Sequence, residues 1–405
     1  MTSRERVWEA VNHRQPDKIP VDIGGTKSTG MHIDEYCELV RYLGLDLLPL
    51  KCYEQFQMLA RVDEEVRRWA GCDVIQVENP VETWGLPNRD WKFWKTGMGN
   101  EVLMPGAHDP VMCDDGNYRL YQNGVSVAYK PPEALYYERD CKTEMSEEIV
   151  FADPDKWASS IKLYDDEELN QMQKQAKFYF ENTDYSIHGG FMKGGLGTVG
   201  MFAGHTFGDW MCILMTERDY AYELLEASAK RAVENLKLYL QAVGPYIDTI
   251  MVSGIDYGMQ DREMFNPDIF RDIYVPNFKI INGYIHNNCR AKIMFHTCGS
   301  NYYLIPHYIE CGVDILNPVH TNAARMEAKR LKDEFGEKMV FWGGGIETQS
   351  VLPKGSPEEI ENQIRERLEI FGKGGGFVFA AIHNIQYGVP PFNLDVMVKA
   401  LRKYR

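Results

Sequence analysis

The stretch KIMFHTCGSNYYLIPHYIECGVDILNPVH, residues 292–320, contains two short apolar runs on either side of a segment with helical character. The runs KIMFH (292–296) and VDIL (313–316) predict buried strands, and residues 300–311 predict a helix between them. A strand, a helix and a second strand in this order join two parallel strands of one sheet. We therefore expect this stretch to form one repeat of an α/β fold.

Strands and helices alternate in the same way over most of the remaining chain. Further short apolar runs predict strands at 19–24, 72–78, 185–190, 248–254, 339–344 and 376–382. Segments with helical spacing lie between or beyond them, at 32–44, 62–70, 205–216, 217–242, 266–286, 324–335, 357–371 and 392–403. Because about eight strands alternate with helices, and no glycine-rich dinucleotide fingerprint is present, we predict a (β/α)8 TIM barrel over a doubly wound sheet.

Two segments fall outside this alternation. Residues 3–13 have apolar positions at helical spacing ahead of the first strand, and they predict an N-terminal helical extension. The second segment includes DDGNYRLYQNGVSVAYKPPEALYYE (114–138), where Asp-Gly and Asn-Gly steps separate runs rich in Tyr and Val, a pattern typical of consecutive β-hairpins. We therefore predict one barrel domain over residues 1–405, with a β-rich insertion or cap at about 88–140.

The composition excludes several classes of partner. The 405 residues include 44 Lys and Arg against 59 Asp and Glu, a formal net charge of −15. No dense basic run is present, which argues against nucleic acid. No segment approaches about 18 uninterrupted apolar residues and the N-terminus lacks the apolar core of a secretory signal, so we expect a cytoplasmic protein outside the membrane. The nine Cys are scattered singly and are expected to stay thiols.

A histidine and a cysteine close the predicted strand at 292–296. Side chains two residues apart in an extended segment point to the same side, so His296 and Cys298 can reach one point at the barrel mouth. Zinc binds imidazole nitrogen and thiolate sulfur, and the ends of later strands offer His320 and His383. We predict a zinc site from these four residues, although spacing alone more often reflects a hydrogen-bonded core histidine and a small buried cysteine.

Other side chains after the predicted strands are candidates for catalysis or substrate binding. Glu78 and Asp256 could act in acid–base catalysis, as could His383, and loop capping is the ordinary alternative for both carboxylates. Aromatic rings near the mouth could line a site for a flat substrate, although such rings are more often core residues. The predicted substrate-binding set is Phe202, His205, Tyr257, Trp342, Asn384 and Gln386.

Several longer motifs resemble the uroporphyrinogen decarboxylase superfamily. They are HRQPDKIPVD (13–22), FHTCG (295–299) with GVDILNPV (312–319), FWGGGIETQSVLPKGSPEEI (341–360) and GGGFVFAAIHNIQYGVPPFNLDVMVKAL (374–401). The resemblance runs over nearly the whole chain, is most specific in the C-terminal third and is weakest in the β-hairpin segment. It implies a (β/α)8 fold, in agreement with the alternation of strands and helices.

The resemblance implies one of two chemistries, because the superfamily has two branches. True decarboxylases use no metal and grip the substrate carboxylates with paired Arg near the N-terminus, followed by an Asp, a Tyr and a late His. Here residues 20–34, PVDIGGTKSTGMHID, contain no Arg, Phe202 stands where the family has Tyr, and His383 matches the late His. The missing guanidinium groups argue against a polycarboxylate substrate, which needs such partners to leave water.

Methyltransferases of the other branch exchange methyl groups with corrinoid proteins, and those with zinc carry a His-x-Cys pair and a Cys after the last strand. His296 and Cys298 match the pair, and His383 replaces the last Cys. The closer resemblance to this branch implies a zinc cofactor and a small methylated donor, for example a methoxylated aromatic that undergoes O-demethylation. The chain has no D-x-H-x-x-G corrinoid signature, so a separate corrinoid protein would be its partner.

Two alternatives stand beside methyl transfer. One is a metal-free decarboxylase in which His383 and Asp256 act directly. The other is a non-catalytic corrinoid- or tetrapyrrole-binding barrel. Zinc content separates the methyltransferase from the decarboxylase, and turnover separates both enzymes from a binding protein. A homodimer is compatible with the sequence in each case.

Overall fold

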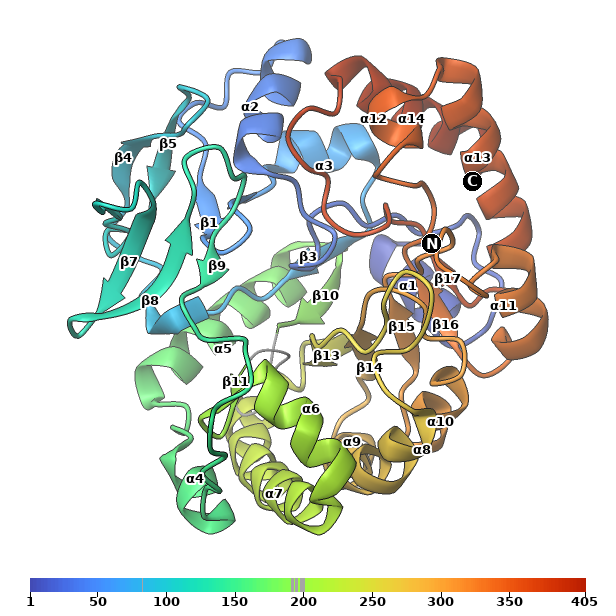
Figure 1. Ribbon diagram of the computed structural model, residues 1–405. Coiled ribbons are helices and arrows are strands. Elements are labelled where there is room, and N and C mark those ends of the chain that lie inside the picture. The colour runs from blue at the N-terminus through green and yellow to red at the C-terminus, as the bar shows by residue number, and fades with distance from the viewer. Residues whose placement is uncertain (82, 191–192, 194–195, 197–200) are drawn as a thin grey trace.

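A ring of parallel strands with helices around it forms the body of the molecule (Figure 1). The computed structural model describes residues 1–81, 83–190, 193, 196 and 201–405. Within these residues, the strands of one parallel sheet lie side by side in the order β3-β10-β13-β14-β15-β16-β17, which is also their order along the chain. The strands are β3 (Val74–Gln76), β10 (Ser186–Gly189), β13 (Thr249–Ser253), β14 (Lys292–His296), β15 (Ile315–Asn317), β16 (Val340–Trp342) and β17 (Phe377–Val378).

Residues 20–22 form an eighth segment that joins the two edges of this sheet. Asp22 N–H donates to the carbonyl of Phe379, directly beyond β17 (2.8 Å). On the other side, Asp73 N–H, directly before β3, donates to the carbonyl of Val21 (2.7 Å). Parallel strands that follow chain order and close on themselves are the (β/α)8 barrel. The predicted fold is confirmed, with the first predicted strand in the closing position.

Helices cover the outside of the barrel, mostly where the sequence predicts them. The longer ones are α2 (Ile33–Tyr42), α3 (Glu64–Ala70), α5 (Asp166–Asn182), α6 (Phe207–Thr216), α7 (Arg218–Val243), α9 (Val275–Asn288), α11 (Ala328–Phe335), α13 (Pro357–Phe371) and α14 (Pro391–Tyr404). Shorter pieces are η1 (Thr83–Gly85), α4 (Pro154–Ser160), α8 (Pro267–Ile269), the π-helical turn η2 (Phe270–Tyr274), α10 (Ile305–Glu310) and α12 (Val351–Lys354). Of the helices that the structure describes, none is long and apolar enough to cross a membrane.

The predicted helix at 300–311 is shorter in the structure, where α10 begins at Ile305. Asn301 accounts for the difference, because its side chain satisfies the backbone in a non-helical way. Its Nδ2 donates to the carbonyls of Cys298 (2.8 Å) and Gly299 (3.1 Å). Asn side chains that bond nearby backbone groups favour turns over helix. The residues after β14 are therefore fixed as a turn before the helix starts.

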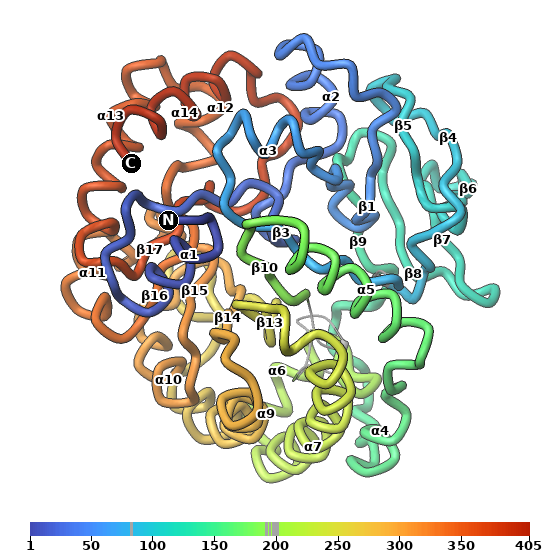
Figure 2. Tube along the Cα trace, turned by 180° about the vertical axis from the view of Figure 1, so that it is seen from behind, coloured from blue at the N-terminus to red at the C-terminus, as the bar shows by residue number. Residues whose placement is uncertain are grey.

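The N-terminal helix α1 (Ser3–Val11) closes the N-terminal end of the barrel (Figure 2). Arg4 N–H donates to the carbonyl of Asp184, just before β10 (2.7 Å), and Gly376 N–H, directly before β17, donates to the carbonyl of Ala10 (2.8 Å). Side chains of α1 and of the strands share one buried apolar cluster, which includes Val7, Val11, Val74, Met251, Met294, Ile315, Val340, Trp342 and Val378. The predicted helical extension therefore plugs one end and leaves the C-terminal strand ends to the loops, where such barrels place their active sites.

The β-rich insertion follows β3 and so starts from the C-terminal end of the barrel (Figure 1). It has two antiparallel sheets, formed by β4 (Lys92–Lys95) and β5 (Glu101–Met104), and by β6 (Val111–Met112), β7 (Tyr118–Gln122), β8 (Val125–Lys130) and β9 (Glu138–Arg139). It meets the hairpin of β1 (Cys52–Glu54) and β2 (Leu59–Ala60), because Tyr137 N–H donates to the carbonyl of Phe56 (3.0 Å). The predicted β-hairpins are confirmed.

Candidate metal centre

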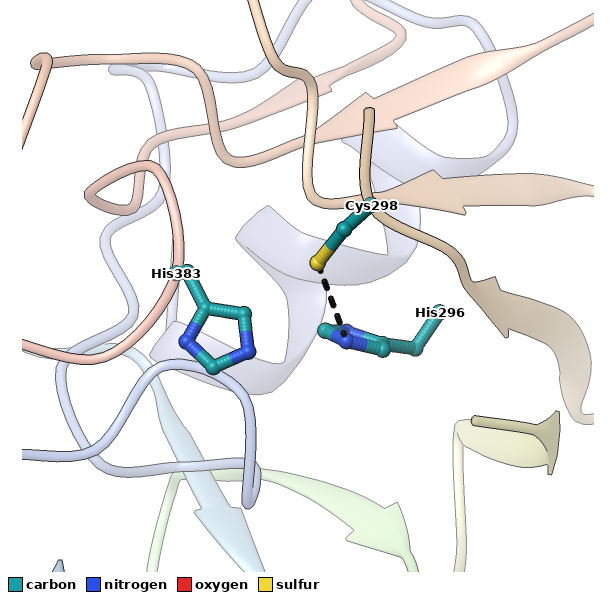
Figure 3. Close-up of side chains that lie close together, drawn as sticks. All are labelled: His296, Cys298 and His383. Atoms are coloured by element: carbon teal, nitrogen blue, oxygen red, sulfur yellow. Dashed lines mark hydrogen bonds between the residues drawn. The ribbon is translucent and has the colours of Figure 1, made fainter. Parts of the chain in front are cut away.

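Three side chains that can bind metal meet at the C-terminal strand ends (Figure 3). His296 is the last residue of β14, Cys298 follows it closely, and His383 lies in the loop beyond β17. One ligand atom from each residue lies within 4.8 Å of the others. The Cys298 Sγ to His296 Nε2 distance is 3.6 Å, and the centres of the two imidazole rings are 5.2 Å apart. We call these three residues the His-Cys-His group.

A glycine allows the loops after β13 and β14 to approach each other. Gly299 has a φ of 84°, in the left-handed region that favours glycine. A Cβ atom on Gly299 would lie 2.4 Å from the backbone carbonyl carbon of Gly258, in the loop after β13. Only a residue without a side chain fits there. The loop that carries Cys298 is therefore packed directly against the loop that carries Asp256.

Asn317, the last residue of β15, fixes the tautomer of His296. Asn317 Oδ1 lies 2.8 Å from His296 Nδ1 and also accepts from Ser28 Oγ (2.6 Å), while its Nδ2 donates to the carbonyl of Trp342 (3.0 Å). Since Oδ1 is an acceptor, His296 Nδ1 must carry the proton. The lone pair of His296 is then on Nε2, on the side of Cys298, which is the arrangement that a metal ligand requires.

We expect Asn317→Ala to weaken zinc binding about 10- to 100-fold, because His296 loses the acceptor that sets its tautomer and its ring orientation. Competition with a chromophoric zinc chelator measures the affinity. Asn317→Asp keeps an acceptor oxygen beside His296 Nδ1 and should keep most of the affinity. Equal zinc affinities for the wild-type protein and Asn317→Ala would contradict this role.

The surroundings of the Cys298 thiol favour a bound cation. Cys298 N–H donates to Asp256 Oδ1 (2.7 Å), and the same oxygen lies 4.0 Å from His296 Nε2. Burial, and then the adjacent Asp256 carboxylate, raise the pKa of Cys298 well above its usual value. A divalent ion reverses this effect, because a coordinating thiol is deprotonated. Imidazole nitrogen and thiolate sulfur are donors that suit zinc, so His296 and Cys298 fit that metal.

His383 differs from His296 in which ring nitrogen carries the proton. Its backbone is left-handed, with a φ of 66°, and Asn384 N–H donates to its Nδ1 (2.7 Å). Burial lowers the pKa of His383 to about 3, with the His296 imidazole as the next cause, so the ring is neutral at pH 7. A neutral imidazole that accepts at Nδ1 carries its proton on Nε2. His383 is thus an N–H donor here, and binding of metal through Nε2 requires that the contact with Asn384 opens.

His320, the fourth predicted ligand, lies beside the His-Cys-His group but is not one of its members. Its Nδ1 accepts from Gly299 N–H (3.1 Å), and its Nε2 is buried without a hydrogen-bond partner among the described residues. Burial lowers the pKa of His320 to about 4, and the His296 imidazole is the next cause. By the same tautomer argument, His320 presents a neutral N–H at Nε2.

The two predicted acid–base carboxylates have different surroundings. Asp256 is half-exposed and touches the loop of Cys298, as described above. Glu78 is paired with Arg61, whose Nε donates to Glu78 Oε1 (2.7 Å) and whose Nη2 donates to Glu78 Oε2. Both carboxylate oxygens of Glu78 are thus occupied by this guanidinium group. The structure therefore places Asp256, and not Glu78, against the His-Cys-His group.

Two aromatic residues predicted to bind substrate are core residues. Trp342 has no exposed surface, and its Nε1 donates to the buried carboxylate of Asp22 inside the barrel (2.8 Å). A buried indole needs such an acceptor, and Asp22 supplies it away from the mouth. Tyr257 is buried and packs edge-on against Phe270 and Tyr274. Trp342 and Tyr257 are therefore committed to contacts inside the fold, and their part in a substrate site stays a prediction.

Phe202 and His205 lie on a short hairpin, β11 (Met201–Phe202) and β12 (His205–Thr206), ahead of α6. Phe202 is buried, with its ring edge-on to Trp210 at 5.0 Å. His205 is also buried, and its Nε2 lies 2.9 Å from the hydroxyl of Tyr220. Both side chains are thus occupied by packing within this hairpin and its neighbouring helices.

The two predicted amides in the loop after β17 differ in their hydrogen bonds. Asn384 is fully used, because its Oδ1 accepts from Gly30 N–H (2.5 Å) and its Nδ2 donates to Gln57 Oε1 (2.7 Å) and to the carbonyl of Lys27 (2.9 Å). Gln386 has a buried Oε1 without a partner in the described part of the chain. Asn384 therefore ties the loop of His383 to the loops before β3, whereas Gln386 keeps a free acceptor.

Sequence reasoning assigned no role to Asn317, although a signal for it is present. The residue is polar, ends the otherwise apolar strand ILN (315–317) and pairs with His296 in the register of β14 and β15. A polar residue at the same level as a predicted ligand on the adjacent strand is a candidate for orienting that ligand. The sequence does not give the register between β14 and β15, so the pairing of Asn317 with His296 is known only from the structure.

The strand order and the closure by residues 20–22 define a (β/α)8 barrel. The His-Cys-His group lies at the C-terminal strand ends, the face at which such barrels place their active sites. Residues 163–404 match the family model described as uroporphyrinogen decarboxylase (URO-D). The chain therefore belongs to the uroporphyrinogen decarboxylase family, as its motifs indicated.

Two curated proteins named uroporphyrinogen decarboxylase are similar over parts of the chain. The protein of Pseudoalteromonas atlantica is 36% identical over 73 residues, which are 18% of this chain and 20% of that protein. The protein of Mannheimia succiniciproducens is 31% identical over 128 residues, 31% of this chain and 34% of that protein. The matched stretches therefore span no more than 34% of the length of these two relatives.

A solved structure extends the similarity to the whole chain. It is described as a methyltransferase from Methanosarcina mazei, and the alignment covers 100% of this chain and 99% of that one, with a TM-score of 0.58. The two sequences are 14% identical. At this level of identity the likeness shows that the two chains share a fold.

Proposed function

We propose that this chain is a zinc-dependent methyltransferase that moves a methyl group from a small methylated donor to the corrinoid of a partner protein. The observation that carries the proposal is the His-Cys-His group, in which a preset imidazole lone pair and a thiol lie 3.6 Å apart at the functional face of the barrel. The fold shared with the methyltransferase from Methanosarcina mazei supports it. The lack of Arg in residues 20–34 argues against a polycarboxylate substrate.

His296 and Cys298 would hold the metal, and His383 would complete the set once its contact with Asn384 opens. Bound zinc supplies a Lewis acid that polarises the oxygen of a methylated donor. The chain itself contributes a neutral N–H on buried His320, which can donate to the oxygen that loses the methyl group. Asp256 holds the loop of Cys298 in place through the backbone N–H of that residue.

The proposed donor and acceptor are chosen to suit this site. A methyl ether of an aromatic ring fits a reaction in which the carbon–oxygen bond breaks, the methyl group goes to the corrinoid and the oxygen takes up a proton. The chain lacks a D-x-H-x-x-G motif, so the corrinoid has to be brought by another protein that docks over the C-terminal strand ends. The proposed donor class is therefore methoxylated aromatics, and the proposed partner is a corrinoid protein.

Turnover with a free corrinoid tests this function. The zinc-loaded protein is incubated with reduced cobalamin and, separately, a panel of methoxyarenes, thiols and methylamines, and the methylated corrinoid is followed by its absorption spectrum. We expect methylation with at least one methoxyarene, at a rate that the Cys212→Ala control on α6 leaves unchanged. Absence of methylation with every donor would refute methyl transfer as the activity.

Metal-free decarboxylation is the second candidate, and one observation favours it. His383 holds its proton on Nε2, so in its described state it is suited to donate a hydrogen bond to a substrate and not to bind metal. Two relatives also carry the name uroporphyrinogen decarboxylase. A purified protein without zinc that releases CO2 from a carboxylic acid, and loses this activity in His383→Ala, would establish the decarboxylase in place of the methyltransferase.

A further inference from the structure

Gln55 is a buried amide that makes no hydrogen bond within the described residues. Its side chain is 1% exposed, and neither Oε1 nor Nε2 has a partner there. A carboxamide can donate two hydrogen bonds and accept two, so all of its capacity is unused. Burying such a group without partners destabilises the folded state, and native proteins rarely keep one without a reason such as a ligand.

The position of Gln55 connects it with the His-Cys-His group. It directly follows β1, in a turn that the Glu54 carboxylate fixes by accepting from the N–H groups of Phe56 (3.2 Å) and Gln57 (2.7 Å). Gln57 Oε1 then accepts from Asn384 Nδ2 (2.7 Å), in the residue next to His383. The turn that carries Gln55 is thus fastened to the loop that carries His383.

Three other free polar atoms at this end of the barrel belong to uncharged groups, whereas Glu35 Oε1, on α2, belongs to a carboxyl group. Buried atoms without partners in the described chain include Asn79 Oδ1 and Trp84 Nε1, beyond β3, and Gln386 Oε1, beyond β17. Trp84 packs edge-on against Phe56, in the turn of Gln55, with ring centres 5.5 Å apart. The carboxylate of Glu78, beyond β3, is already paired with the guanidinium group of Arg61. Apart from Glu35, the unused hydrogen-bonding capacity of these residues is therefore that of amides and an indole.

We propose that Gln55 determines substrate specificity by hydrogen bonding an uncharged hydroxyl group of the methyl donor. A hydroxyl donates one hydrogen bond and accepts others, so it can use both Oε1 and Nε2 of one amide. For the methoxylated aromatics of the proposed function, on which this inference rests, the preferred donor is a methoxyphenol. A carboxylate would need cationic partners, which this set of side chains does not offer.

The stability of a Gln55 variant tests the proposal without any ligand. Gln55→Met replaces a buried amide that has no partner by an apolar side chain of similar length, so we expect a melting temperature equal to or above that of the wild type. The matched control is Gln57→Met, which removes a used acceptor from Asn384 and should lower the melting temperature. If Gln55→Met loses as much stability as Gln57→Met, Gln55 has a structural role and the proposal is overturned.

Ligand binding tests the chemical class. Titration calorimetry with 2-methoxyphenol and with methoxybenzene compares a donor that has the hydroxyl group with one that lacks it. We expect the wild type to prefer 2-methoxyphenol by about tenfold or more, and Gln55→Met to lose this preference. No binding of 2-methoxyphenol, or equal affinities of the wild type for both compounds, overturns the proposal. Methyl transfer is measured separately, so its absence beside an intact hydroxyl preference would refute only the proposed function.

Discussion

Replacement of Cys298 by alanine is expected to abolish zinc binding and methyl transfer together. The variant retains one preset ligand, His296 Nε2, and His383, whose Nε2 carries a proton in the described state. Catalytic zinc sites use three protein ligands, so the two imidazoles alone hold the ion weakly. We expect zinc to fall from about one per chain to background after dialysis, and the rate of corrinoid methylation to fall by about a thousandfold. Elemental analysis and the absorption assay measure the two effects.

Three further variants make this result interpretable. Cys212→Ala removes a cysteine on α6 that is not part of the His-Cys-His group, and should keep both zinc and activity. His296→Ala should behave like Cys298→Ala, because it removes the other preset ligand. His383→Ala separates two roles, since loss of zinc identifies a ligand, whereas full zinc with lost activity identifies a hydrogen-bond donor to the substrate. A Cys298→Ala protein that keeps its full zinc content would show that the metal is bound elsewhere.

The barrel could be predicted from the sequence because its signal is local. Strands that are buried on both faces appear as short apolar runs, and KIMFH and VDIL show this clearly on either side of a helical segment. The closing segment at 20–22 forms few backbone bonds to each neighbour, yet the short apolar run at 19–24 was enough to predict it. The Asp-Gly and Asn-Gly steps in residues 114–138 likewise predicted the β-hairpins without any tertiary information.

The site was only partly predictable, because its chemistry depends on contacts between distant segments. The spacing of His296 and Cys298 predicted that both reach one point, and the position of His383 after the last strand predicted the third side chain. Trp342 was a candidate because an aromatic ring near the mouth could line a site for a flat substrate, but its indole donates to Asp22, 320 residues away in the chain. Spacing cannot show which nitrogen of His383 carries the proton, since the Asn384 contact sets that.

Asp73 is the side chain whose removal we expect to destabilise the barrel most. It is 2% exposed and lies directly before β3. Its carboxylate accepts from Ser3 Oγ (2.7 Å) and Arg6 Nη1 (2.5 Å) on α1, from Val21 N–H in the closing segment (3.0 Å), and from Arg405 Nη1 at the C-terminus (3.4 Å). One group thus joins both chain ends to the strand at which the barrel closes.

Asp73→Ala is expected to lower the free energy of unfolding by about 3–5 kcal/mol, because it leaves the largely buried guanidinium of Arg6 without one of its two carboxylate partners and Val21 N–H without an acceptor. Urea denaturation measures the loss. Asp73→Asn keeps an acceptor oxygen but removes the charge, and should lose less. Glu9→Ala breaks the surface pair with Arg14 and should leave the midpoint unchanged. A loss in Asp73→Ala no larger than that in Glu9→Ala would show that barrel closure does not depend on this carboxylate.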